Sequence, residues 1–164
     1  PRVASVLYAA DRYESGEKIK SWLKAGYTVI ADRYASANQI HQGGKIDEPS
    51  ERKKFLTWLD TMEHEVFKIP RPDLVVYLDV PFEVSQHWLK QKVAQRKKKY
   101  LKGRKDVAED NLLHLKNSRQ SALGLVKQNK NWRLIKCCEG MVCMPPEAVH
   151  EAVFDLVGKE LKLD

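Results

Sequence analysis

The chain has 164 residues, of which 43% are hydrophobic and 31% are charged, a balance typical of a globular domain that excludes an intrinsically disordered chain. The formal net charge of +7 favours an anionic partner, and nucleic acid, a membrane surface and a nucleotide phosphate all meet that description. No apolar run reaches the roughly 20 residues that a membrane-spanning helix needs, so no membrane-spanning segment is expected.

Three cysteines, Cys137, Cys138 and Cys143, lie close together near the end of the chain. An odd and clustered set does not resemble a disulfide framework, and no second ligand pair has the spacing of a zinc site. We therefore expect buried or incidental thiols in the reducing environment of a cytoplasmic protein.

The first third of the chain predicts a helix followed by a strand. Apolar residues at helical spacing run from about residue 3 to residue 25, and Gly16 could break this helix near its middle. Gly26 then has the position of a left-handed C-terminal cap. The short apolar run of residues 27–31 predicts a strand that is buried on both faces.

The next segment predicts a helix that begins at Pro49 and ends before Pro70. Its apolar stripe has four residues at helical spacing: Phe55, Leu59, Met62 and Val66. Residues 74–78 form another continuous apolar run and predict a second buried strand.

The second half continues this alternation. Helices are predicted around residues 84–89, over 108–126 and after Pro146, with a shorter strand near 133–137. Strands separated by helices predict an α/β fold, a parallel sheet with helices on both faces, in one domain over residues 1–164. Such sheets bind ligands beyond the carboxyl ends of their strands.

At the carboxyl end of the first predicted strand stand Asp32 and Arg33, followed by a polar loop with glycines up to Lys45. Arginine suits phosphate because its planar fork donates two parallel hydrogen bonds. The neighbouring carboxylate can hold a magnesium-bound water or orient the arginine. A salt bridge that caps the strand explains the same pair, and position alone does not decide between the two.

Two further features have ordinary explanations beside functional ones. A second Asp-Arg-Tyr, residues 11–13, lies on a predicted helix, where a surface ion pair is the simplest interpretation. The basic stretch of residues 96–105 could be a solvated loop, or it could bind nucleic acid with Tyr100 as a stacking platform. His64, His87 and His114 lie on predicted helices and are expected to pack or to face solvent.

Residues 6–14, Val-Leu-Tyr-Ala-Ala-Asp-Arg-Tyr-Glu, resemble the helix of thymidylate kinases that brings an arginine to the thymine base. A glycine, a buried strand and a second Asp-Arg-Tyr follow at the spacing usual in that family. Residues 77–84 resemble the family's later strand and turn, and residues 145–150 resemble the segment that enters its final helix. The resemblance spans nearly the whole chain.

This resemblance implies the parallel sheet of a P-loop NTPase-like nucleoside monophosphate kinase. It further implies phosphoryl transfer from ATP to dTMP, giving dTDP, with Mg²⁺ and a homodimeric protein. Neither nucleic acid nor a membrane is then expected as a partner. Two alternatives stay open: a non-catalytic nucleotide- or nucleic-acid-binding protein on a decayed kinase scaffold, and a related kinase with another nucleotide acceptor.

The resemblance also assigns the acceptor site. Arg33 would bind the monophosphate, and Asp32 would lie near Mg²⁺ and the transferring phosphate. Arg12 would contact the base, and Asn38 stands where several bacterial members hydrogen-bond the pyrimidine. His41 stands where the family has an aromatic residue or glutamine near the deoxyribose, so histidine is a departure that leaves room for another acceptor.

The basic stretch corresponds to the family's lid, over about residues 94–108. A lid can bring positive charge to the transferring phosphoryl group and exclude water as it closes. We expect Arg96 and Arg104 to be its phosphate contacts. Val107 stands where the family often has an arginine.

Thymidylate kinases hold ATP in a Gly-rich loop that ends in Lys-Ser or Lys-Thr. Residues 43–45, Gly-Gly-Lys, are too short for such a loop and follow the wrong strand. The resemblance therefore implies that roughly 50 to 70 residues, with the family's first strand and helix, precede Pro1. On this interpretation the 164-residue chain alone is inactive.

Overall fold

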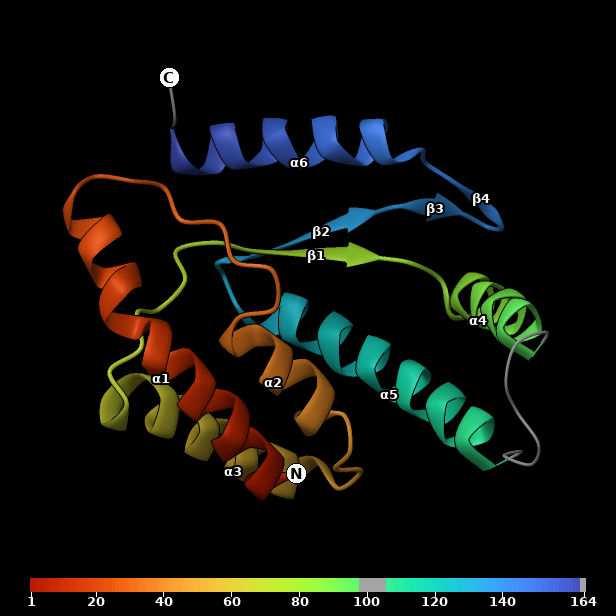
Figure 1. The fold of residues 1–164 in the computed structure, drawn as a ribbon, viewed down its shortest axis with the longest axis horizontal. Helices are drawn as coiled ribbons and strands as arrows, with labels where there is room; N and C mark the ends of the chain where they lie inside the picture. The colour runs from red at the N-terminus through yellow and green to blue at the C-terminus, as the bar shows by residue number, and fades with distance from the viewer. Residues whose placement is uncertain (98–105, 163–164) are drawn as a thin grey trace. The chain divides into compact units, whose positions relative to one another are not determined.

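The computed structural model describes residues 1–97 and 106–162, and the side chains of residues 1–91 and 112–162. The chain divides into two compact units, an N-terminal unit (Pro1–Asp73) and a C-terminal unit (Leu74–Asp164). Figure 1 shows their helices and strands. The single kinase-like domain over residues 1–164 stays a prediction.

The N-terminal unit is helical. Its elements are α1 (Arg2–Lys24), α2 (Ala35–Gly43), α3 (Pro49–Asp60) and the π-helix η1 (Thr61–Val66), which continues directly from α3. The helix predicted at the start of the chain is confirmed, and it passes through Gly16 without a break. Gly26 follows its end with a φ of 84°, the left-handed conformation expected of a C-terminal cap.

The buried face of α1 consists of small residues rather than the large apolar ones. Ser5, Ala9 and Gly16 are buried at helical spacing, whereas Val3 and Leu7 are exposed. Small side chains let the backbones of neighbouring helices approach closely, and α1 packs against α2. Arg12 lies on the same face of α1 as Ala9, which directs its side chain into the unit.

The core of this unit lies between α1 and α3. Ala9, Phe55, Leu59 and Met62 form its buried cluster, which confirms three of the four residues in the predicted stripe. Val66 was wrongly placed in that stripe, because it is exposed. The cause is η1: its longer turns, with Phe67 N–H donating to the Met62 carbonyl at 3.0 Å, change the phase of the helix after Asp60.

Two predictions for residues 27–45 are wrong. Residues 27–31 form no strand, and Ile30 is 89% exposed rather than buried. A strand needs a neighbour for its backbone hydrogen bonds, and the described residues provide none for this segment. The expected polar loop after Tyr34 is instead the helix α2, which shares its buried side with α1 and α3.

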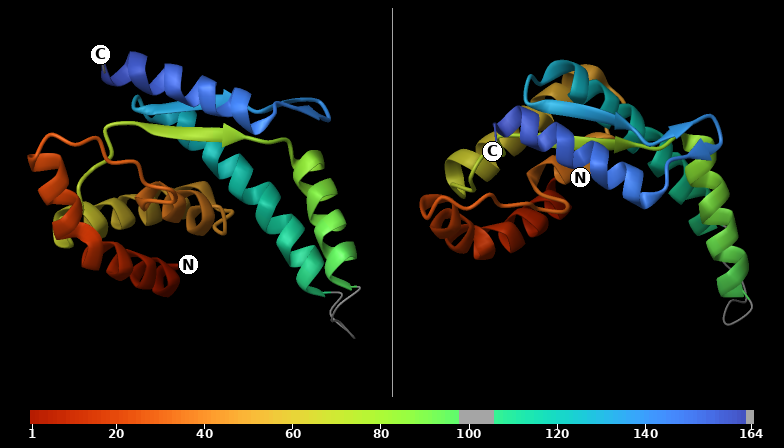
Figure 2. Two further views of the ribbon diagram at one scale, coloured as in Figure 1. Left: turned by 45° about the horizontal axis from the view of Figure 1, so that its top comes forward. Right: turned by 90° about the horizontal axis from the view of Figure 1, so that it is seen from above.

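The C-terminal unit contains the parallel sheet. Strand β1 (Val75–Asp79) pairs in parallel with β2 (Trp132–Lys136), from Val75 opposite Trp132 to Asp79 opposite Lys136. Helices α5 (Asp106–Gln128) and α6 (Pro146–Leu161) cover opposite faces of these strands (Figures 1 and 2). The predicted α/β arrangement is therefore confirmed for this unit.

The connection from β1 to β2 has the length that parallel strands require. It contains α4 (Phe82–Lys97) and α5, so both ends of the predicted lid segment are helical. Asp79, at the end of β1, accepts two hydrogen bonds from the Arg119 guanidinium of α5, at 2.7 and 2.9 Å. This ion pair joins α5 to the strand on which it packs.

The expectation for the cysteines was wrong in part. Cys138 and Cys143 form a disulfide across the antiparallel pair of β3 (Cys138–Glu139) and β4 (Val142–Cys143). The chain reverses at Gly140, whose φ is 58°, and this reversal makes the two cysteines neighbours. Cys137 is a buried free thiol, as expected, and burial raises its pKa.

We predict that Leu59→Ala lowers the free energy of unfolding by about 2–5 kcal/mol, because it leaves a cavity in the buried cluster between α1 and α3. Leu113→Ala, at an exposed position of α5, is the matched control and should change it by less than about 0.5 kcal/mol. Chemical denaturation followed by circular dichroism measures both. Equal losses in the two variants would contradict the assigned core.

Candidate functional site

A buried ion pair joins α1 to η1. Arg12 donates from Nε to Oε2 of Glu63 at 2.7 Å and from Nη2 to Oε1 at 2.5 Å. The Glu63 side chain is 1% exposed and that of Arg12 is 11% exposed. The predicted surface ion pair within the helix is therefore wrong: Arg12 points inward and pairs with a residue 51 positions later in the chain.

Asn38 of α2 joins the same carboxylate. Its Nδ2 atom donates to Glu63 Oε1 at 3.0 Å and to the Ser5 carbonyl at 3.1 Å. The residue is 3% exposed. Arg12 and Asn38, both assigned to the base from the sequence, thus converge on one acidic side chain.

Tyr34 completes this group, which we call the Glu63 cluster: Glu63, Arg12, Asn38 and Tyr34. Its hydroxyl donates to the Pro70 carbonyl at 2.9 Å. Burial raises the pKa of Tyr34 to about 12, while the charge of Arg12 lowers it and that of Glu63 raises it. The phenol therefore stays neutral and fixes the residue that immediately precedes α2.

Asp32 and Arg33 stand just before Tyr34, whose hydrogen bond to Pro70 anchors the chain here, and both are exposed. Arg33 has a φ of 61°, a left-handed conformation that is uncommon for residues other than glycine. The alternative of a strand-capping salt bridge is not borne out, because residues 27–31 are no strand and the described residues offer neither side chain an ion-pair partner.

Tyr34 alone separates Arg33 from the amino end of α2. No side chain caps it, and its first turn contains no acidic residue. Unpaired backbone N–H groups and the helix dipole make such an end favourable for an anion. Arg33 and the start of α2 therefore place two sources of positive potential next to each other in the chain.

Gln42 is a buried polar residue that the sequence did not single out. It lies one turn after Asn38 on α2 and is 5% exposed. Its Oε1 atom has no hydrogen-bond partner among the described residues. A buried acceptor in this state costs about 1–3 kcal/mol, so a donor from water or a ligand is expected there.

The remaining predicted site residues are placed less fully. His41 lies on α2 and is half-buried. Arg96 belongs to α4, in the part of that helix whose side chains are not described, and Arg104 lies outside the described residues. Their assigned roles stay predictions. His64, by contrast, packs as expected, with Nδ1 donating to the Ile69 carbonyl at 2.8 Å.

Glu63 is the central residue that the sequence analysis missed. A signal was present, since Glu63 stands four residues after Leu59 on the apolar stripe of the predicted helix. Arg12 stands three residues after the buried Ala9. Two opposite charges on the inner faces of two helices could have been paired in advance, because a buried charge needs a partner.

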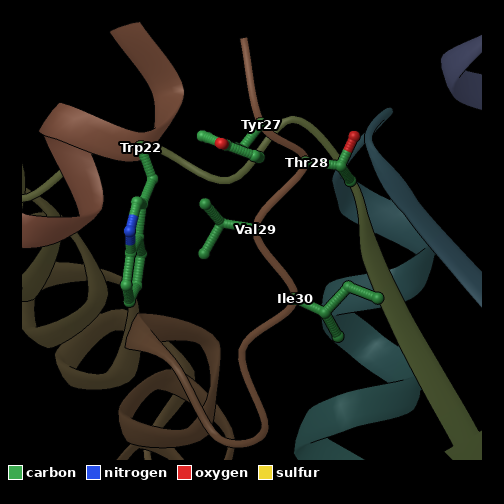
Figure 3. A pocket seen from close by; sticks show the side chains of 5 residues that line it. All are labelled: Trp22, Tyr27, Thr28, Val29 and Ile30. Carbon is green, nitrogen blue, oxygen red and sulfur yellow. The ribbon is translucent and has the colours of Figure 1, made fainter. Parts of the chain in front are cut away.

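A shallow cavity of about 340 Å³ lies elsewhere in the N-terminal unit. Trp22 and four consecutive residues line it: Tyr27, Thr28, Val29 and Ile30. In Figure 3 Val29 points toward the indole of Trp22 while Ile30 points away, the alternation of an extended segment. None of the predicted site residues lines this cavity, so it is not the candidate site.

Raising the pH from 10 to 12 should lower the free energy of unfolding. The folded-state pKa of Tyr34, about 12, exceeds the ordinary value of 10.0, so the unfolded chain loses this proton first. Tyr77, whose pKa burial also raises to about 12, adds a second contribution. Tyr34→Phe should therefore make the decline less steep in urea unfolding across this pH range. An unchanged slope would contradict the burial of the phenol.

Comparisons with known proteins show which family the chain resembles. The family model of thymidylate kinase matches residues 1–144. A probable thymidylate kinase of Pyrococcus abyssi is 32% identical over 160 residues, which are 96% of this chain and 65% of that protein. A thymidylate kinase of Mesoplasma florum is 30% identical over 106 residues, 64% of this chain and 47% of the relative.

A probable thymidylate kinase of Pyrobaculum aerophilum is 28% identical over 110 residues, 66% of this chain and 52% of that protein. The chain thus spans about half the length of several curated relatives that it matches. Within the described residues, no helix combines the length and the apolar character that crossing a bilayer requires. The match over residues 1–144, together with the two Asp-Arg-Tyr segments, identifies the chain as a member of the thymidylate kinase family.

Proposed function

We propose that the full-length protein transfers the terminal phosphate of ATP to dTMP and so forms dTDP. Family membership and the printed names of the relatives support this activity. The observation that carries it is the convergence of Arg12 and Asn38 on Glu63, since two residues assigned to the base are held together at one place. The activity, its substrates and its partners belong to the whole protein.

In this proposal Arg12 contacts the pyrimidine and Asn38 hydrogen-bonds it. Both side chains are already held by protein contacts, so little conformational entropy is lost when the nucleotide binds. His41, one turn after Asn38 on α2, is proposed to lie near the deoxyribose.

Arg33 is proposed to bind the acceptor monophosphate together with the uncapped amino end of α2. The Tyr34 anchor supports this role, because it fixes the backbone immediately after Arg33. Catalysis would depend on orientation and electrostatic stabilisation of the transferring phosphoryl group, without a covalent intermediate.

The candidate metal ligand, the Asp32 carboxylate, is of the kind that binds Mg²⁺ in phosphoryl transfer. The described residues contain no cluster of three or more His, Cys, Asp or Glu that could hold a metal on its own. Mg²⁺ in kinases is commonly bound through one or two carboxylates together with substrate phosphates and waters. The exposed carboxylate of Asp32 is the group proposed to hold it, and the ion would offset negative charge on the phosphates.

Three further parts of the proposal come from family membership. Arg96 and Arg104 are proposed as phosphate contacts of a lid, and the protein is proposed to be a homodimer. A P-loop with its strand and helix is proposed to bind ATP. Its strand would pair with residues 27–31. The extended and exposed state of that segment supports the last part, since its backbone has no strand partner among the described residues.

Arg33→Ala in the full-length protein should lower kcat/KM for dTMP on the order of a hundredfold, because about 3 kcal/mol of transition-state stabilisation is lost with the guanidinium. Arg33→Lys should also be impaired, since one ammonium cannot reproduce two parallel hydrogen bonds. A coupled assay of ADP release measures both variants.

The control for this experiment is Arg71→Ala. Arg71 is an exposed arginine of the same unit whose contacts are surface ion pairs with Asp60 and Glu65. Such pairs contribute little to stability, so its kcat/KM should stay close to that of the unmodified protein. Unchanged kcat/KM in Arg33→Ala would remove Arg33 from the phosphate site.

A further inference from the structure

The carboxylate of Glu63 has a feature that core packing alone does not require. It is among the most completely buried side chains described, and a buried carboxylate costs several kcal/mol unless donors surround it. Leucine or methionine would fill the same space without that cost. The charge of Glu63 therefore indicates a role in holding Arg12 and Asn38, beyond filling space.

Three hydrogen bonds reach the two oxygens of Glu63. Arg12 supplies two of them and Asn38 the third, from two different helices. The contacts with Arg12 use Nε and Nη2, so the N–H groups of Nη1 take no part in this ion pair. The guanidinium is thus held by one edge and keeps donors for a ligand.

The same carboxylate, together with the Ser5 carbonyl, fixes which way the Asn38 amide is turned. Both contacts of Nδ2 are with acceptor groups, the Glu63 carboxylate and the Ser5 carbonyl, so the nitrogen must be the inward atom. The Oδ1 atom is then the end of the amide that remains for a ligand. Glu63 therefore leaves a donor on Arg12 and an acceptor on Asn38.

A donor and an acceptor held by one carboxylate can distinguish pyrimidines. Thymine and uracil present a carbonyl oxygen next to a ring N–H, which complements an arginine N–H and an amide oxygen. Cytosine presents an amino group and an unprotonated ring nitrogen, which would meet donor with donor and acceptor with acceptor. Such a mismatch leaves buried polar groups unpaired and costs affinity.

We propose that Glu63 is a positioning residue that sets base selection, by orienting Arg12 and Asn38 for thymine and uracil and against cytosine. The inference rests on the proposed function and adds to it the residue that enforces the choice. Glu63 itself does not touch the nucleotide.

The test is Glu63→Gln in the full-length protein, with dissociation constants for dTMP, dUMP and dCMP measured by calorimetry. Glutamine places a donor against Arg12 or Asn38, so the orientation of the pair is lost. The preference for dTMP over dCMP should fall by about tenfold. The preference for dTMP over dUMP should stay constant, because these two bases share the recognised edge.

The matched control is Glu65→Gln, two residues further along η1, where the exposed carboxylate pairs with Arg71. Both preferences should be unchanged in this variant. A purely structural role of Glu63 predicts that its variant binds all three nucleotides equally less well, and that result would overturn the inference.

If Glu63→Gln does not fold, Glu63→Asp takes its place, because aspartate keeps the charge but is too short to reach both partners. The same loss of preference against dCMP is expected. Failure of both variants to fold would assign Glu63 to stability alone and overturn the inference. An unmodified protein that binds none of the three nucleotides overturns the proposed function, whereas normal dTMP binding with unchanged preferences in the variants overturns only the role of Glu63.

Discussion

A carboxylate removed from water must be surrounded by donors, and in the N-terminal unit this requirement determines how the helices meet. Glu63 receives hydrogen bonds from α1 and α2 while it belongs to the segment that continues α3. Each helix therefore contributes one polar side chain at a shared point inside an otherwise apolar contact. Apolar packing alone tolerates sliding, whereas three hydrogen bonds of defined geometry do not.

The C-terminal unit uses the same device with less burial. Asp79 ends β1 and is held by both nitrogens of an Arg119 fork from α5. In both units an arginine from one element fixes a carboxylate of another, and both carboxylates are buried. The exposed pairs of Arg71 differ from these, because water competes for the same groups and screens them.

Secondary structure is predicted best from the sequence where the residues of a segment determine it by themselves. The runs that became β1 and β2 are short, apolar and bounded by turn residues, and the structure shifts each of them by only one position. The run of residues 27–31 looks the same, yet it forms no strand, because pairing depends on a neighbour and not on the run itself. Helix α2 was missed for the opposite reason: its polar residues resemble a loop, and the contacts that stabilise it come from other helices.

The candidate site, too, could be predicted only in part from the sequence. Arg12 and Asn38 were found through their likeness to a family, but the contact that unites them was not, because it joins residues far apart in the chain. Glu63 in an apolar stripe was the available signal. No signal in the sequence indicated the conformation of Arg33. A positive φ at a residue other than glycine depends on the surrounding structure rather than on local preference.

The π-helical segment η1 makes the spacing of this region as important as its composition. A π turn takes up one more residue than an α turn, so deletion of one residue can convert it into an α turn. Loss of one residue from Thr61–Val66 would restore α-helical turns and rotate the following chain by about 100°. Phe67 and Ile69, which pack inside the unit, would then leave their places. The packing of this unit therefore depends more on the number of residues between Leu59 and Pro70 than on the identity of the exposed ones.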